Sequence, residues 1–178
     1  DVIWDNSAVN YALSRGLWNF ATRTSKIEID NDFAPPFGFK HAFTKPSDWI
    51  RTAGLSEDEY FAHPLNDYKD EAGYWFADSD IIYVSYVSNH EDYGGNLSLW
   101  TEAFRRYFES YLAFETCERI TQNESKKEGL FKISDQRLIQ AKSIDSINEA
   151  AAFPPRGSWA KARFGDRNSN NRNERRGN

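Results

Sequence analysis

SRGLWNFATRT (residues 14–24) and PPFGFKHAFTKPSDWIR (residues 35–51) are the two stretches that decide the fold of this chain. They place large aromatic side chains at short intervals among Pro, Gly and Arg, and they contain no cluster of residues typical of a catalytic site. Each such ring removes roughly 150–250 Å² from water when it is buried. We therefore expect them to form a packing framework, and the expected core residues, including two from a later helix, are Trp18, Phe20, Phe39, Trp49, Trp100 and Phe104.

Helical periodicity of apolar residues is strongest in the second half of the chain. A wide aromatic stripe predicts a helix over about 97–120, and Leu and Ile at helical offsets predict another over about 125–150. The short connection between them predicts an antiparallel hairpin. Earlier in the chain, the same criterion predicts a helix over 6–23, and Ser47 or Asp48 is placed to cap a short helix ending near Arg51.

Alternating and β-branched residues between these helices predict strands. The segment 26–30 alternates Ile with charged residues, Phe37, Phe39, His41 and Phe43 share one face of an extended segment, and 81–87 has the strongest β propensity. Strands at 68–69, 74–77 and 81–87 are predicted to form a meander. The predicted fold is α+β and mainly helical: a helical bundle with a small antiparallel β-rich insertion at about 25–88, forming a body of residues 1–155.

Charge divides the chain into an acidic body and a basic end. Residues 156–178 contain seven Lys and Arg against two acids, a net charge of +5, so the other 155 residues carry −10. An acidic body argues against nucleic-acid binding by the body itself. The C-terminal segment has three interpretations: a solubilising end, a contact to DNA phosphates, or an extended arm that orders on a partner protein. The aromatics among its basic residues favour the arm, with contacts by Arg156, Trp159, Lys161, Arg163, Phe164 and Arg167.

Residues that could carry chemistry are scattered. Cys117 is the single cysteine and lies in an apolar helical pattern, so a small buried hydrophobe is its expected role. The three histidines lie in unrelated segments, which disfavours a metal site, and we expect no cofactor. Neighbouring acids at 57–59 and 70–71 leave open a carboxylate-dependent glycan hydrolase, although adjacent acids on exposed turns usually form a solvated surface. A nucleic-acid-binding module acting through the basic tail is the second alternative.

The packing residues themselves resemble a known pattern. It consists of WNFA at 18–21 followed by Arg23, the run from Pro36 to Arg51 with its Phe-Gly-Phe and Asp-Trp-Ile-Arg, and the strand 82–87 before an aromatic helix. This pattern is similar to the tail tubular protein A family, the head-to-tail adaptors of short-tailed bacteriophages. The resemblance covers roughly residues 10–120 and rests on packing residues, without a catalytic signature.

The resemblance implies a virion structural protein without enzymatic activity. It implies a homo-oligomeric ring of twelve copies between the portal protein and the downstream tail tube or nozzle protein. Double-stranded DNA would pass through this ring without specific binding, and no membrane is involved. A heterologous contact, in which two different surfaces meet, forms a closed ring when the rotations from copy to copy add up to a full turn. We also expect surplus exposed aromatic residues to form the faces between copies.

Overall fold

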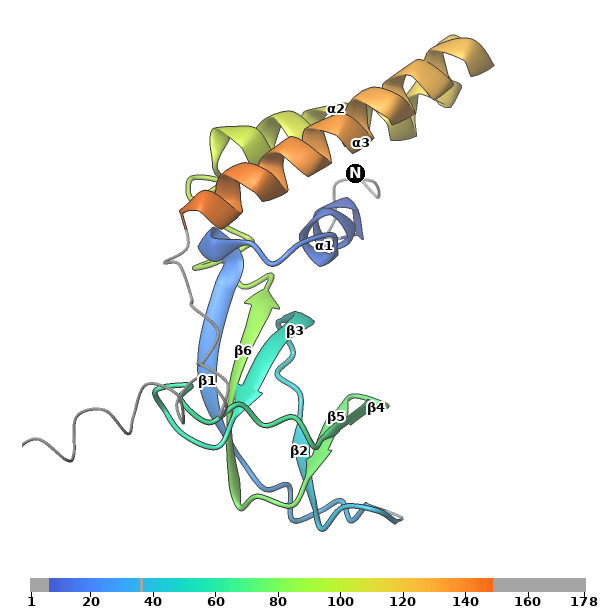
Figure 1. Cartoon of the computed structure of the whole chain (residues 1–178). Helices are drawn as coiled ribbons and strands as arrows, with labels where there is room; N and C mark the ends of the chain where they lie inside the picture. Colours follow the sequence, from blue (N-terminus) through green and yellow to red (C-terminus); the bar gives the residue numbers. More distant parts are fainter. Residues whose placement is uncertain (1–6, 36, 149–178) are drawn as a thin grey trace, which may run out of the picture.

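The computed structural model describes residues 7–35 and 37–148 (Figure 1). The elements, in chain order, are α1 (Ser7–Ser14), the short 3₁₀ helix η1 (Asn19–Ala21), β1 (Thr22–Glu28), β2 (His41–Thr44), β3 (Trp49–Ser56), β4 (Lys69–Glu71), β5 (Tyr74–Ala77), β6 (Ile81–Ser88), α2 (Glu102–Thr121) and α3 (Glu124–Ile147).

The strands form two antiparallel sheets of three strands each. In the first sheet β6 lies between β1 and β3, and in the second β5 lies between β2 and β4. The hairpin of α2 and α3 lies across one end of the first sheet, with α1 beneath it, and its far end extends beyond α1 (Figure 1). The protein therefore has a helical layer stacked on a sheet region.

Each of these two regions has its own hydrophobic core. The first core joins the helices to the top of the first sheet and is centred on Phe104, whose ring lies 4.8 Å from both Trp18 and Trp100 between centroids. The second core lies within the sheet region and contains Phe43, Leu55, Trp75, Ala77, Ile82, Val84 and Tyr86. A sheet region with an apolar core of this size is more than an insertion.

The prediction of a mainly helical bundle with a small β insertion is therefore wrong. The described residues form three α-helices and two three-stranded antiparallel sheets. The predicted meander is wrong as well, because β4 and β5 pair in the second sheet whereas β6 crosses to the first. The helical hairpin was predicted correctly from its periodicity, and α2 and α3 make the most extensive contact between elements.

The helix predicted over 6–23 ends at Ser14 because Trp18 folds back onto it. The Trp18 Nε1–H donates to the carbonyl of Leu13 at 3.0 Å, and a Cβ on Gly16 would lie 2.8 Å from the Trp18 ring. Only glycine fits that close approach. The chain then enters β1 at Thr22, and all seven residues of this strand pair with β6.

The segment after Asp48 is a strand because long-range pairing overrides the local capping signal. Asp48 caps no helix, since its carboxylate accepts hydrogen bonds from β1 and β6 instead. Trp49–Ser56 pairs with β6 along most of its length, with register shifts near Ile50 and Ala53. The strand 81–87, with the highest β propensity in the chain, thus gains a partner on both sides.

Candidate functional site

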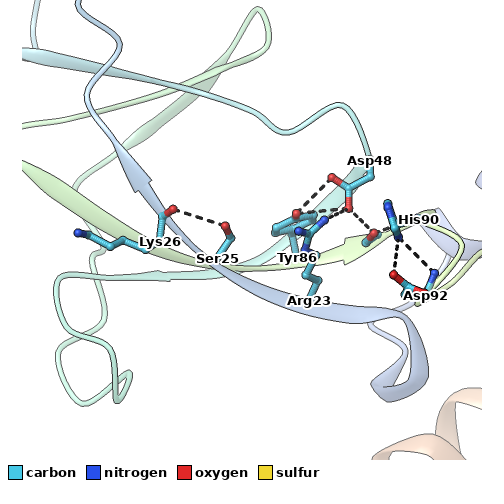
Figure 2. Close-up of polar contacts among 8 residues, drawn as sticks. Arg23, Ser25, Lys26, Asp48, Tyr86, His90 and Asp92 are labelled. Carbon is cyan, nitrogen blue, oxygen red and sulfur yellow. Dashed lines mark hydrogen bonds and ion pairs between the residues drawn. The ribbon is translucent and has the colours of Figure 1, made fainter.

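A buried polar cluster, which we call the Asp48 cluster, lies at the end of the first sheet that meets the helical layer. It consists of Arg23 on β1, Asp48 just before β3, and Tyr86 and Ser88 on β6 (Figure 2). Asp48 accepts hydrogen bonds from Arg23 Nη1 at 2.8 Å, from Ser88 Oγ at 2.5 Å, and more weakly from the Tyr86 hydroxyl at 3.3 Å. One carboxylate thus links all three strands of the first sheet.

The cluster also fixes the loop that leads into the helical layer. The backbone N–H of His90 donates to Ser88 Oγ at 3.0 Å, and that of Asn89 donates to the Asp48 carbonyl at 3.0 Å. Gly94 packs so tightly that a Cβ there would lie 2.3 Å from the Ser88 carbonyl oxygen. The sheet and the start of the helical hairpin are therefore held together through this loop.

The electrostatics of the cluster are those of a structural ion pair. Burial opposes the charge on Asp48, but hydrogen bonds from Ser88 and Arg23 outweigh it and lower the pKa of the carboxyl. Burial, reinforced by the charge of Asp48, raises the pKa of Tyr86 to about 12. At neutral pH Asp48 is an occupied acceptor and Tyr86 a neutral donor, so neither is poised to exchange a proton with a substrate.

The other buried carboxylate among the described residues is Asp145, near the end of α3. It accepts the backbone N–H of Asn19 at 3.0 Å and so holds η1 against the helical layer. It belongs to a contact separate from the Asp48 cluster. The arrangement needed for glycoside hydrolysis, two buried carboxylates facing one cleft, is not present among residues 7–35 and 37–148.

The acids that suggested a hydrolase have local partners instead. Asp58 accepts the backbone N–H groups of Tyr60, Ala62 and His63 and thereby shapes the loop after β3. Burial opposes its charge, but these bonds dominate and lower the pKa of Asp58 to about 2. Asp70 pairs with Lys45, whose ammonium lies 3.6 Å from the centroid of the Trp49 ring.

Within the described part of the chain, no group of three His, Cys, Asp or Glu side chains is placed to hold a metal ion. His41, His63 and His90 each lie beside a single aspartate in a different loop or strand end. Cys117 is buried in α2. None of the helices in the described ranges is long and apolar enough to cross a membrane.

The residues expected in the core differ in burial. Trp18, Trp100 and Phe104 are buried in the first core, and Phe20 packs against it while remaining partly accessible. Trp49 is partly buried against the second core. Phe39 is also partly buried but belongs to neither core, because Gly38 turns the chain at φ +93° and β2 begins only at His41.

The expected contacts of the C-terminal arm lie outside the described residues. These are Arg156, Trp159, Lys161, Arg163, Phe164 and Arg167. Sequence reasoning missed the Asp48 cluster, because Asp48 was interpreted as a helix cap. A signal was nevertheless present, since both Arg23 and Asp48 belong to the pattern of packing residues that carries the family resemblance.

Exposed apolar side chains gather on the helical hairpin and are mostly aliphatic. Sequence reasoning expected aromatic residues on the surfaces between copies, but most of the rings in the helical layer pack inside it. The exposed large apolar residues of α2 and α3 are Ile120, Phe131, Ile133, Ile139, Ile144 and Ile147. Ile120 and Ile147 are each 76% exposed, which is costly unless something covers them.

No protein-family model matches this chain, and no curated protein matches it at a significant level of similarity. The inference about function therefore depends on the residues and their geometry.

Proposed function

We propose that this protein is a virion structural protein, a head-to-tail adaptor that assembles into a ring between a portal and the tail. The single observation that carries the proposal is the projecting helical hairpin with uncovered isoleucines. It is supported by the sequence resemblance and by the role of the resembling residues, since Trp18, Arg23 and Asp48 form framework contacts and enclose no substrate site.

Three of the isoleucines form one stripe along α3, which we call the isoleucine stripe: Ile133, Ile144 and Ile147. Their positions differ by eleven and by three, so they fall on the same side of a helix with 3.6 residues per turn. The side that packs on α2 and α1 carries Leu138 and Ala141 instead. A second apolar stripe beside the packed one is typical of a helix that contacts two neighbours.

A stripe of this kind fits the side face of a ring subunit. In a ring, one surface of each copy contacts a different surface of the next copy. Such contacts form a closed ring when the rotations from copy to copy add up to a full turn. The stripe residues are accessible to a neighbouring copy, since Ile133 is 43%, Ile144 47% and Ile147 76% exposed. In this proposal the isoleucine stripe packs on the adjacent subunit, and twelve copies match the portal.

The distribution of charge supports a role in guiding DNA without binding it. Residues 28–80, which form most of the sheet region, contain twelve acids and four bases, whereas residues 97–148 contain eight of each. An acidic wall repels phosphates, whereas a basic wall would bind them by releasing counterions. The proposed subunit places its sheet region toward the channel and the downstream tail protein, and its arm toward the portal.

The test measures assembly of the full chain by mass photometry, alone and with the cognate portal ring. We expect a complex containing twelve copies of the chain. The double variant Ile133→Glu/Ile144→Glu should form no ring, whereas Ile139→Glu should assemble normally. Ile139 is a matched control because it is 63% exposed on the same helix but on a different side.

Thermal unfolding followed by circular dichroism checks that both variants keep the fold. The proposal fails if the wild-type chain does not associate with the portal at micromolar concentrations. It also fails in its account of the interface if the double variant assembles as well as the Ile139→Glu control.

A further inference from the structure

A preformed apolar bowl lies at the base of the helical hairpin. Leu97, Trp100, Phe108 and Leu112 line it, with the exposed charges of Arg105 and Glu109 beside them, and its volume is about 460 Å³. That volume lies within the range of sites that bind ligands or side chains, about 300–1,000 Å³. Leu97 is 49% exposed, so the bowl opens to the surface.

Hydrogen bonds hold the bowl open without a ligand. The Trp100 Nε1–H donates to the Gly94 carbonyl at 2.8 Å, and Arg105 Nη2 donates to the Leu97 carbonyl at 3.1 Å. The side chain of Thr101 then caps α2 by accepting the backbone N–H of Phe104. Because the walls are fixed in advance, a side chain that enters the bowl loses little free energy to ordering it.

The chain leaves α3 at the same end of the helical hairpin as this bowl. Asn148, which follows the last residue of α3, lines a hollow together with Thr101 and Glu102, and these two residues directly follow Trp100 of the bowl. Figure 1 shows the end of α3 beside the loop that enters α2. The residues after 148 therefore start at the end of α2 that carries the bowl, on a neighbouring side of that helix.

We propose that the bowl binds the C-terminal segment of the same chain, with Trp159 as the anchor. Trp159 follows Asn148 by eleven positions, and a chain of that length spans at most about 36 Å, enough to pass around the start of α2 to the bowl. Residues 156–178 carry +5 against −10 for the rest of the chain, so attraction keeps the segment close to the body, and the apolar lining of the bowl then favours Trp159 as the side chain that enters it. Glu109 lines the bowl, and its carboxylate is placed to form an ion pair with an arginine of the segment.

This docking defines a resting state of the free chain. It covers an apolar surface before any partner is present, and it keeps the arm from other contacts until a stronger partner competes for it. The inference concerns the isolated chain and holds whether or not the chain forms rings. A failure of ring assembly therefore does not affect it, and its own failure leaves the ring proposal intact.

Disulfide trapping tests the contact directly in the full chain. In a Cys117→Ala background, the pair Leu97→Cys/Ser158→Cys should form an intramolecular disulfide at least roughly tenfold faster than a control pair, Ile133→Cys/Ser158→Cys, because docking raises the effective concentration of the two thiols. Adding Trp159→Ala should remove this advantage. Thermal unfolding shows whether each variant keeps its fold.

Two outcomes would overturn the proposal. Equal rates for the two cysteine pairs would show that the segment does not prefer the bowl. Disulfides that link two chains, with a yield that rises with protein concentration, would show that the bowl receives the segment of another copy. Independently, hydrogen exchange of the amides in 97–112 should accelerate about tenfold in Trp159→Ala, as expected when an aromatic anchor is lost, and unchanged exchange would also refute docking.

Discussion

Removing the carboxylate of Asp48 should destabilise the protein far more than removing an exposed aspartate such as Asp80. Asp48 is 9% exposed and links β1, β3 and β6 through Arg23, Ser88 and Tyr86. In the variant Asp48→Ala, the Ser88 hydroxyl loses its acceptor while remaining fully buried, and the Arg23 guanidinium loses its partner. The substitution thus tests whether the cluster holds the sheet to the helical layer.

The expected loss in the free energy of unfolding is about 3 kcal/mol. A buried hydroxyl left without its acceptor costs about 1–3 kcal/mol. The ion pair adds only about 1 kcal/mol, since the Arg23 side chain is 34% exposed and can be solvated. The long bonds to Tyr86 add little. For a chain of this size, about 3 kcal/mol corresponds to a fall in Tm of about 6–12 °C.

Urea unfolding followed by tryptophan fluorescence measures this loss. Asp80→Ala is the control, because its side chain is 90% exposed and its removal should change the stability by less than about 0.5 kcal/mol. Asp48→Asn keeps the shape and one acceptor, so it should lose about half as much as Asp48→Ala. A loss below about 1 kcal/mol for Asp48→Ala, or one equal to that of the control, would refute the reasoning.

The lowered pKa of Asp48 adds a pH dependence with a defined sign. A carboxyl whose pKa is lower in the folded chain than its ordinary value of 3.8 stabilises the fold fully above that value. Its contribution is lost as the pH falls below 3.8 and through the folded pKa. The difference in stability between the wild-type chain and Asp48→Asn should therefore be largest near neutral pH and shrink in acid, whereas a constant difference would contradict an ionised Asp48.

Three further predictions follow from local geometry. Gly94→Ala should cost about 3 kcal/mol in urea unfolding, because its Cβ would meet the Ser88 carbonyl oxygen at 2.3 Å and backbone must shift. Gly129→Ala, at an exposed helical site with nothing within 4 Å, should instead stabilise by about 0.5–1 kcal/mol, and a loss there would show an unrecognised contact. Between pH 3.8 and about 2, protonation of Asp58 should speed amide exchange in 60–63 relative to its intrinsic rate, whereas protection unchanged at pH 2 would contradict the anchoring of this loop.

Sequence reasoning identified the parts of this fold that depend on local periodicity. The aromatic stripe of α2 and the offsets of α3 specify a hairpin without reference to the rest of the chain. The strand 81–87 was equally clear, because a run of β-branched and aromatic residues has few alternatives. The predictions failed where contacts between distant residues decide the structure. The main example is the segment that begins at Asp48, because the partners of Asp48 lie 25 and 40 positions away in the chain.

The candidate surfaces were harder to predict for a related reason. Exposure of an isoleucine depends on which side of a helix the rest of the molecule covers, and α3 carries apolar residues on more than one side. Leu138 and Ile144 both belong to the helical pattern, yet Leu138 is 4% exposed and Ile144 is 47% exposed. Periodicity identified the helix but could not separate the buried stripe from the uncovered one.

The framework and the proposed contact surfaces use different residues. Trp18, Arg23 and Asp48, which belong to the pattern of packing residues identified in the sequence, are bound by contacts within the chain and are not free to bind a partner. The isoleucine stripe lies beyond residue 120, outside the range of the resemblance, and the bowl is lined by residues near its end. Substitutions in the framework should therefore change stability first, and substitutions in the stripe should change assembly at constant stability. If Ile133→Glu/Ile144→Glu destabilised the chain as much as Asp48→Ala is expected to do, this separation would be wrong and the stripe would be part of the fold.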